Sequence, residues 1–324
     1  MGSHPFVTFR ESMRKDLGFR VGTGFFGLLL ILIVAAIGFE LTRQSWLSIR
    51  EFGLDFWRTS TWDPVAGEFG ALPFIWGTLY SSVLALLIAT PVAIGIAVFI
   101  TELSPPVLRQ PLVFLTELLA AIPSIVYGLW GIFVLVPAVR WVQVALPDGL
   151  RQLPFFSGPP LGVGMLSATL ILAVMVVPFT SSVAREVLKS VPVAQREAAY
   201  ALGATRFEAI SAALFYARTG IVGAVMLGFG RALGETMAVT MVIGNNPQVS
   251  LSLFDPQYTM AAVLANEFTE AADELYLHAL IEIGLVLFII TLVVNSLSRL
   301  LIWSMGRSTA AQAPPAVAVV SAPA

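Results

Sequence analysis

Residues 73–100 read PFIWGTLYSSVLALLIATPVAIGIAVFI, a run without a single Asp, Glu, Lys or Arg. About 20 mostly apolar residues are enough for a helix to cross the hydrocarbon core of a bilayer. Pro91 interrupts the run, and a membrane helix tolerates proline where neighbouring helices satisfy the backbone carbonyl that it frees. The stretch therefore predicts a membrane-spanning helix packed against others.

Further apolar runs of membrane length lie on both sides of this stretch. The other expected spans cover about 21–40, 112–139, 160–183, 219–243 and 275–303. Pro123 and Pro178 fall inside two of them, which indicates bent helices in a bundle rather than a single straight anchor. The sequence thus predicts an all-α polytopic membrane protein with six transmembrane helices.

The composition excludes several classes of protein. Hydrophobic residues make up 57% of the 324 residues, charged residues only 12%, and the formal net charge is −2. A soluble domain carries about twice that charged fraction, and a nucleic-acid binder needs a basic surface. With no Cys and two His, neither a disulfide framework nor a metal site is expected. No GxxxxGK[ST] motif or catalytic constellation is present, so ATP hydrolysis by this chain is not expected.

Lys and Arg predict the orientation, because they concentrate in cytoplasmic loops. We expect both termini in the cytoplasm. The outer loop 244–274 contains neither Lys nor Arg, which supports this orientation. The chain then divides into a cytoplasmic N-terminal segment (1–20), a transmembrane domain (21–303) and a disordered cytoplasmic tail (304–324), the last from its Ala/Pro-rich composition.

The longest expected inside loop is 184–218, between the fourth and fifth spans. Pro192 suits the first turn of a helix and Gly203 suits a helix end, with a second helical run over 205–216. The loop is therefore expected to project as a helix–Gly–helix unit. It is either an ordinary connector packed on the bundle or a docking surface for a soluble partner.

Within this loop, Glu197-Ala198-Ala199 followed by Gly203 resembles the EAA loop of ABC-importer membrane subunits. The resemblance implies that these four residues couple the chain to an ATPase subunit. Small side chains allow close approach, and glycine allows a sharp turn. One departure is that family members often carry a Leu-Pro pair about a dozen residues after the glycine, where this chain has Phe215-Tyr216.

The fifth expected span contains two charged residues, Arg231 and Glu235. An ionisable residue at the bilayer centre costs at least about 2.5–3.5 kcal/mol and marks a functional site by default. In a continuous helix the two residues lie on one face, at i and i+4. They are either a mutual ion pair that lets the helix insert or part of an anion path, in which the guanidinium binds an oxyanion. Thr236 and Ser124 are candidate hydrogen-bond donors to such an ion.

The stretch Gly230–Thr240 (GRALGETMAVT) and the stretch Ala121–Phe133 (AIPSIVYGLWGIF) resemble the phosphate branch of these permeases, the PstC type. The resemblance covers residues 75–303 and implies a type I ABC-importer permease fold with a core over 73–303. It implies a bacterial inner-membrane location, a second PstA-type permease, two cytoplasmic ATPase subunits and an extracytoplasmic phosphate-binding protein. By the same resemblance this chain binds no cofactor, and ATP and Mg²⁺ belong to the partner ATPase.

Three alternatives remain open at this point. The chain is a permease for another oxyanion, sulfate or molybdate; a passive anion channel; or a membrane-embedded enzyme acting on lipid phosphate. A channel has no need of a docking loop, and an enzyme needs an acid/base or metal-ligand cluster at one interface, which the sequence does not offer.

Overall fold

The structure, a computed structural model, describes the backbone of residues 9–310 and the side chains of residues 19–305 other than that of Asp148. It is helical almost throughout, with one short β-hairpin. In chain order the elements are α1 (Phe9–Gln44), α2 (Trp46–Phe52), the 3₁₀ turn η1 (Gly53–Trp57), β1 (Trp62–Asp63), β2 (Glu68–Phe69), α3 (Leu72–Val98), the π-helical turn η2 (Phe99–Leu103), α4 (Pro106–Ala121), α5 (Ser124–Trp130), the π-helical turn η3 (Gly131–Leu135), α6 (Val136–Ala145), α7 (Asp148–Arg151), α8 (Met165–Lys189), α9 (Val193–Ala201), α10 (Arg206–Leu233), α11 (Met237–Thr240), α12 (Met260–Glu267) and α13 (Glu274–Ala310).

The described residues contain six helical segments long and apolar enough to cross a membrane, which confirms the predicted number and the all-α class. The segments are 19–44, 72–103, 124–145, 165–189, 206–233 and 274–305.

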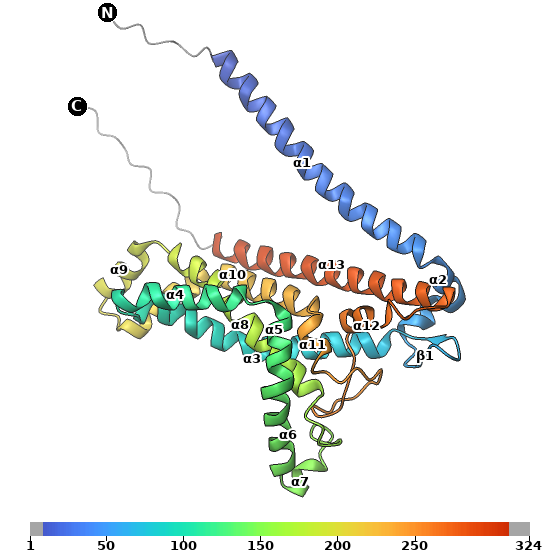
Figure 1. The fold of residues 1–324 in the computed structure, drawn as a ribbon. Coiled ribbons are helices and arrows are strands. Elements are labelled where there is room, and N and C mark those ends of the chain that lie inside the picture. The colour runs from blue at the N-terminus through green and yellow to red at the C-terminus, as the bar shows by residue number, and fades with distance from the viewer. Residues whose placement is uncertain (1–8, 311–324) are drawn as a thin grey trace, which may run out of the picture.

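A bundle of α3, α4, α8, α10 and α13 forms the body of the molecule (Figure 1). Helix α8 lies at its centre, packed against α3, α4 and α10, and 61% of its most apolar window is buried. Small residues along α3, among them Ala85, Ala89 and Ala93, are fully buried and let the helices approach closely.

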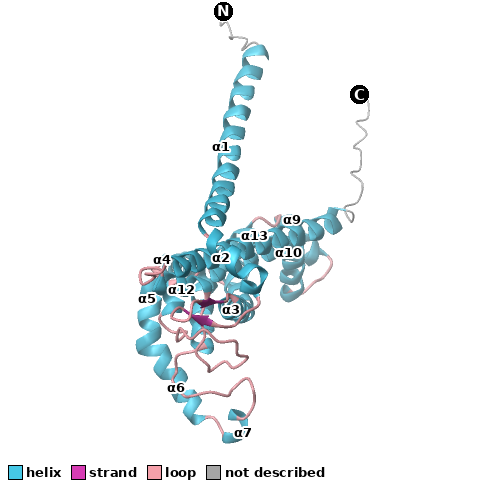
Figure 2. Ribbon diagram, turned by 90° about the vertical axis from the view of Figure 1, so that its right-hand side faces the viewer, coloured by secondary structure: helices cyan, strands magenta, loops and turns pink. Residues whose placement is uncertain are grey.

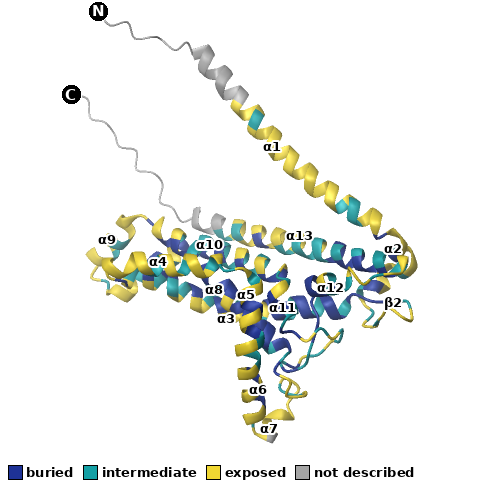
Figure 3. Ribbon diagram, viewed as in Figure 1, coloured by how far each residue is buried: buried dark blue, intermediate teal, exposed yellow. Residues whose placement is uncertain are grey.

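Helix α1 leaves the bundle at an angle, and none of its apolar window is buried within this chain (Figures 1 and 3). Its contact with α13 includes Gly38, whose Cα faces the ring of Phe288 at close range. Residues 9–20 belong to α1, so the helix continues through the boundary expected at residue 20. Likewise α13 continues to Ala310, past the expected start of the tail, and residues 1–8 and 311–324 lie outside the described part.

The expected span 112–139 is wrong as a single helix. The chain breaks at Ile122–Pro123, and α5 and α6 turn away from α4 and project from the bundle (Figures 1 and 2). Pro123 has no amide hydrogen to donate, and a residue before proline is disfavoured in the α conformation. Ile122 accordingly adopts an extended backbone, with φ −64° and ψ 129°.

The segment between α11 and α12 folds back into the bundle. The amide of Leu166, in the first turn of α8, donates to the carbonyl of Leu253 at 2.6 Å, and the indole of Trp76 in α3 donates to the carbonyl of Ser250 at 2.8 Å. The loop is therefore bonded to the N-terminal turns of both α3 and α8, next to α11, which precedes it in the chain.

Candidate functional site

The fifth spanning segment is broken in the middle of its charged stretch. Helix α10 ends at Leu233, Gly234 to Thr236 are not helical, and α11 starts at Met237. The Glu235 carboxylate accepts from the amide of Ala238 at 3.5 Å, and the Thr236 hydroxyl donates to the carbonyl of Gly234 at 3.3 Å. Such local bonds offer the backbone an alternative to the helix. The expected continuous helix over 219–243 is therefore wrong, and Glu235 is not at a helical i+4 position.

Arg231 lies in the last turn of α10, where the helix dipole favours a positive charge. Its guanidinium carbon is 5.6 Å from the centroid of the Phe179 ring in α8, a cation–π distance. Among the described residues no carboxylate forms an ion pair with it, and its side chain is exposed in the isolated chain. The interpretation of Arg231 as half of a mutual ion pair with Glu235 thus has no support in the geometry.

Helix α5 approaches this break from the other side. Gly128 packs so closely on α11 that a Cβ there would lie 3.2 Å from the Cα of Ala238. Tyr127 lies within electrostatic range of Arg231 and donates its hydroxyl hydrogen to the carbonyl of Leu119 at 2.8 Å. The sequence did not single out Tyr127 or Phe179, because an aromatic residue in an apolar run is indistinguishable from a core residue.

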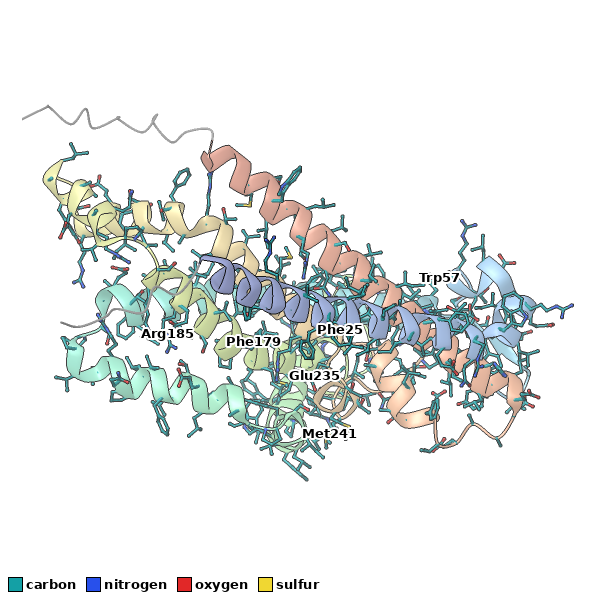
Figure 4. All side chains as sticks on the ribbon, turned by 90° about the horizontal axis from the view of Figure 1, so that it is seen from above. Phe25, Trp57, Phe179, Arg185, Glu235 and Met241 are labelled. Carbon is teal, nitrogen blue, oxygen red and sulfur yellow. The ribbon has the colours of Figure 1, made fainter. Side chains whose placement is uncertain are left out.

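The four residues expected along a substrate path therefore come from two packed elements. Arg231, Glu235 and Thr236 surround the break between α10 and α11, and Ser124 is the first residue of α5. No described hydrogen bond joins Ser124 to the other three. Figure 4 shows Phe179 and Glu235 near the middle of the molecule, and Arg185 closer to the end that carries α9.

The glycines around Arg231 differ in their surroundings. A Cβ on Gly228 would lie 2.3 Å from the hydroxyl oxygen of Thr180, so this glycine permits close contact between α10 and α8. A Cβ on Gly230 or Gly234 would meet no heavy atom closer than 3.7 Å. Gly230, whose nearest neighbour on that side is Asn295 of α13, and Gly234 are thus not needed for close packing, whereas Gly228 serves helix packing.

At one end of the bundle, α9 and the start of α10 form the expected helix–Gly–helix unit. Pro192 precedes the first residue of α9, and Gly203 turns the chain with φ +83°, a conformation that favours glycine. A capping box joins Thr205 and Glu208: the Glu208 carboxylate accepts from the Thr205 amide at 2.7 Å. The second run is not a separate helix, because α10 continues without a break from Arg206 to Leu233.

The outer surface of this unit is open. Glu197 and Ala198 are exposed, and Ala199 is half-buried. Leu202 is 89% exposed and Phe207 79% exposed, and beside them a groove of about 520 Å³ runs between α9 and α10. Its lining consists of Gln195, Phe207, Glu208, Ser211, Ala212, Phe215 and Tyr216. An exposed apolar patch with polar neighbours is typical of a protein-binding surface.

Two ion pairs near this end join segments that are distant in the sequence. Arg185 in α8 is buried and pairs with Glu117 in α4 at 3.0 Å. Arg196 in α9 pairs with Glu102 in η2 at 2.6 Å. Arg185 also pairs with Glu186 at 3.0 Å, and Glu117 is largely exposed, whereas Arg196 and Glu102 are both mostly covered. From the sequence alone, one expects only that a charged residue next to an apolar segment has a partner of opposite charge. The sequence does not indicate which carboxylate pairs with which arginine.

Six membrane-length helices, with a glycine-hinged unit that projects at one end, define the membrane subunit of a binding-protein-dependent transport system. The chain belongs to this family: the family model described as "Binding-protein-dependent transport system inner membrane component" matches residues 89–306. It is a permease subunit of an ABC importer and not an enzyme.

Relatives in this family carry a more specific name. The chain is 48% identical to the "Phosphate transport system permease protein PstC" of Haemophilus influenzae, over 89% of this chain and 93% of that protein. It is 42% identical to the protein of the same name from Mesorhizobium japonicum, over 94% of this chain and 95% of the other. A probable phosphate transport permease PstC from the archaeon Methanocaldococcus jannaschii is 38% identical over 83% of this chain and 87% of its own.

The fold is also found in a solved structure, the inward-facing MetNI methionine ABC transporter. The match has a TM-score of 0.55 and covers 72% of this chain and 94% of the other, with 15% sequence identity. At that identity the similarity concerns the fold, which is that of an ABC-importer permease.

Proposed function

We propose that this chain is the permease for inorganic phosphate in an ATP-driven importer, and that it forms one half of the translocation pathway. The observation that carries the proposal is an exposed arginine, with no ion-pair partner among the described residues, at a helix break inside a spanning segment. The names of the relatives, at up to 48% identity over most of the chain, supply the identity of the ion.

Arg231 binds the ion in this proposal. A guanidinium donates two parallel hydrogen bonds to a tetrahedral oxyanion, and in a site with little water these bonds are stronger than in bulk solution. Phe179 lies on one side of the guanidinium, and Gly234, at the break between α10 and α11, carries no side chain that would obstruct the ion. Ser124 and Thr236 add hydroxyl donors at the edges of this space.

Glu235 then selects among anions. A carboxylate repels a fully deprotonated ion, but it accepts a hydrogen bond from a protonated oxygen. Near neutral pH phosphate carries such a proton and sulfate does not. The weak bond of Glu235 to the Ala238 amide, at 3.5 Å, leaves acceptor capacity for that contact.

Helix α10 links the ion site to the energy source. It starts beside α9 and ends with Arg231 in its last turn, about 40 Å away at 1.5 Å per residue. In this proposal α9 binds to the ATPase subunit, and the contact residues are Glu197, Ala198, Ala199 and Gly203. Closure of the ATPase dimer moves α9 and with it the near end of α10, and the pathway around Arg231 opens alternately to the two sides.

The proposal extends to the orientation of the chain and to its partners. The end that carries α9 faces the cytoplasm, together with the start of α1 and the end of α13, which lie toward the same end of the molecule (Figure 1). Two ATPase subunits with ATP and Mg²⁺ bind there, and a phosphate-binding protein delivers the ion at the opposite end. A second, PstA-type permease completes the pathway in the bacterial inner membrane.

The test is uptake of labelled phosphate by the complete importer in proteoliposomes, with phosphate, sulfate and molybdate as competitors. Phosphate alone should compete at low concentration. Preferential competition by sulfate or molybdate shows instead a sister oxyanion permease. Uptake without ATP or without the ATPase subunits shows a passive channel.

A further inference from the structure

Glu102, in the turn η2 that follows α3, contacts both parts of the helix–Gly–helix unit. Its Oε1 accepts from Arg196 Nη2 at 2.6 Å and from Arg196 Nε at 3.1 Å. Its backbone carbonyl accepts from the guanidinium of Arg206, the first residue of α10. One residue thus joins the end of α3 to α9 and to the start of α10.

Arg196 is held on its other side by the last turn of α8 and by the loop that follows it. Its Nη2 donates to the carbonyl of Leu188 at 3.1 Å, and its Nη1 donates to the carbonyl of Val191 at 3.1 Å. Only 21% of the Arg196 side chain and 13% of the Glu102 side chain are exposed. The guanidinium therefore forms four hydrogen bonds in a largely desolvated position, which makes a firm attachment rather than a surface ion pair.

The rest of α9 offers little to hold it to the bundle. None of its residues is buried, and Glu197 and Ala198, next in sequence to Arg196, are exposed on the outer side. Arg196 therefore faces the bundle, whereas its neighbours face outward, where the ATPase subunit of the proposed function binds. Glu102 itself lies in the π-helical turn η2, and π-helical turns occur frequently at functional sites.

We propose that the Glu102–Arg196 pair transmits displacement of α9 to α3, so that ATPase closure moves α3 together with α10. The inference rests on the proposed function and adds to it. In that function α10 alone joins α9 to the ion site; the pair gives α9 a second connection, through η2, to a helix packed along α8. Glu102 and Arg196 are positioning residues that touch neither the ion nor ATP.

The experiment measures phosphate transported per ATP hydrolysed by the complete importer, for Glu102→Gln and Arg196→Gln. Each should lower the ratio about five-fold or more, the smallest factor typical of coupling between sites, while the ATPase subunits still copurify. The exchange Glu102→Arg with Arg196→Glu should restore part of the ratio. The matched control is Lys189→Gln, which breaks an exposed pair with Glu186 at the same end of the molecule and should leave the ratio unchanged.

A covalent link tests the same inference where a single substitution harms assembly. The chain contains no Cys, so Glu102→Cys with Arg196→Cys introduces the only two thiols. The ratio should be high when a short cleavable reagent joins them and should fall when the link is cleaved. A ratio that does not depend on the link, or that stays normal in the assembled Gln variants, overturns the proposal.

A readout that does not involve phosphate separates this inference from the proposed function. With Leu87→Cys on α3, which is 67% exposed, the rate of thiol labelling should change on addition of ATP to the importer. Arg196→Gln should abolish that change. If ATP alters labelling equally with and without Arg196, the pair does not transmit movement, whichever ion the importer carries. If wild-type importer transports no phosphate but Arg196→Gln still abolishes the labelling change, the proposed ion is wrong and the inference stands.

Discussion

Replacement of Arg231 by Gln tests the ion site directly. The guanidinium is exposed, and no described carboxylate is paired with it, so the substitution leaves no buried charge without a partner. What is lost is the pair of charge-assisted hydrogen bonds to phosphate. Each contributes about 1.5–3 kcal/mol, and two contribute about 3–6 kcal/mol. Because 1.4 kcal/mol is a factor of ten, transport efficiency should fall by about two to four powers of ten.

Replacement of Arg231 by Lys tests whether the side chain donates two hydrogen bonds to phosphate. Lysine keeps the charge but presents a point donor in place of the planar fork. With one of the two bonds lost, about 1.5–3 kcal/mol, efficiency should fall by about one to two powers of ten. The Lys variant should therefore lie between wild type and the Gln variant on a logarithmic scale.

The assay is initial-rate uptake of labelled phosphate by the complete importer in proteoliposomes, over a range of phosphate concentrations. ATPase copurification controls for assembly. Arg299→Gln is the matched control, since Arg299 is an exposed arginine on a spanning helix, α13, outside the proposed path. The loss of two hydrogen bonds should lower transport efficiency far more than about threefold. If the efficiency of Arg231→Gln stays within about threefold of wild type, Arg231 does not bind the ion.

Three further predictions follow from the same geometry. Glu235→Gln should reduce the preference for phosphate over sulfate about tenfold or more in competition assays, because one charge-assisted hydrogen bond is lost; an unchanged preference contradicts the selectivity argument. Gly228→Ala should lower the thermal midpoint of the purified chain, because the added Cβ lies 2.3 Å from the Thr180 hydroxyl and overpacking costs about 1–3 kcal/mol; Gly230→Ala, which meets no close atom, is its control. Gly203→Val should weaken ATPase copurification, because φ is +83° there, and Gly203→Asn should retain it, since asparagine tolerates that conformation; equal copurification of the two variants shows that the turn does not matter for docking.

Much of the fold follows from local features of the sequence. The lengths of the apolar runs predict the six spans, because a helix satisfies all backbone hydrogen bonds within one segment and a bilayer offers no water to replace them. Pro192 and Gly203 give the ends of α9, because each restricts or relaxes one backbone angle. These features act within a few residues and need no knowledge of the rest of the chain.

The errors arise where the balance between local alternatives decides the structure. Pro91 and Pro178 lie inside continuous helices, whereas Pro123 separates α4 from α5. All three are prolines in apolar runs, and only the neighbouring helices determine whether the chain bends or breaks. The same holds at Glu235, where a side-chain bond to the Ala238 amide replaces a helical turn that the apolar pattern predicted.

Residue type, position in the apolar runs and the family resemblance predict the ion-site candidates, but their surroundings come from distant segments. Phe179 lies against Arg231 from α8, and Arg196 meets Glu102 across 94 positions of the chain. A charged residue in an apolar segment requires a partner, but its identity depends on which helices pack together. That information exists only in the assembled bundle.

The exposure of Arg231 has a further consequence for the assembly. A guanidinium that faces lipid at the bilayer centre costs at least about 2.5–3.5 kcal/mol, so its open side must face water or protein. The described residues leave that side uncovered, and α1, with none of its apolar window buried, stands apart from the bundle. A closed path needs walls on all sides of the ion, since a path open to lipid exposes the charge and a permanently open aqueous path lets phosphate leak down its gradient. In the proposed function, one copy of this chain supplies α5, α8 and α10 as walls on one side, and the second permease subunit supplies the opposite wall.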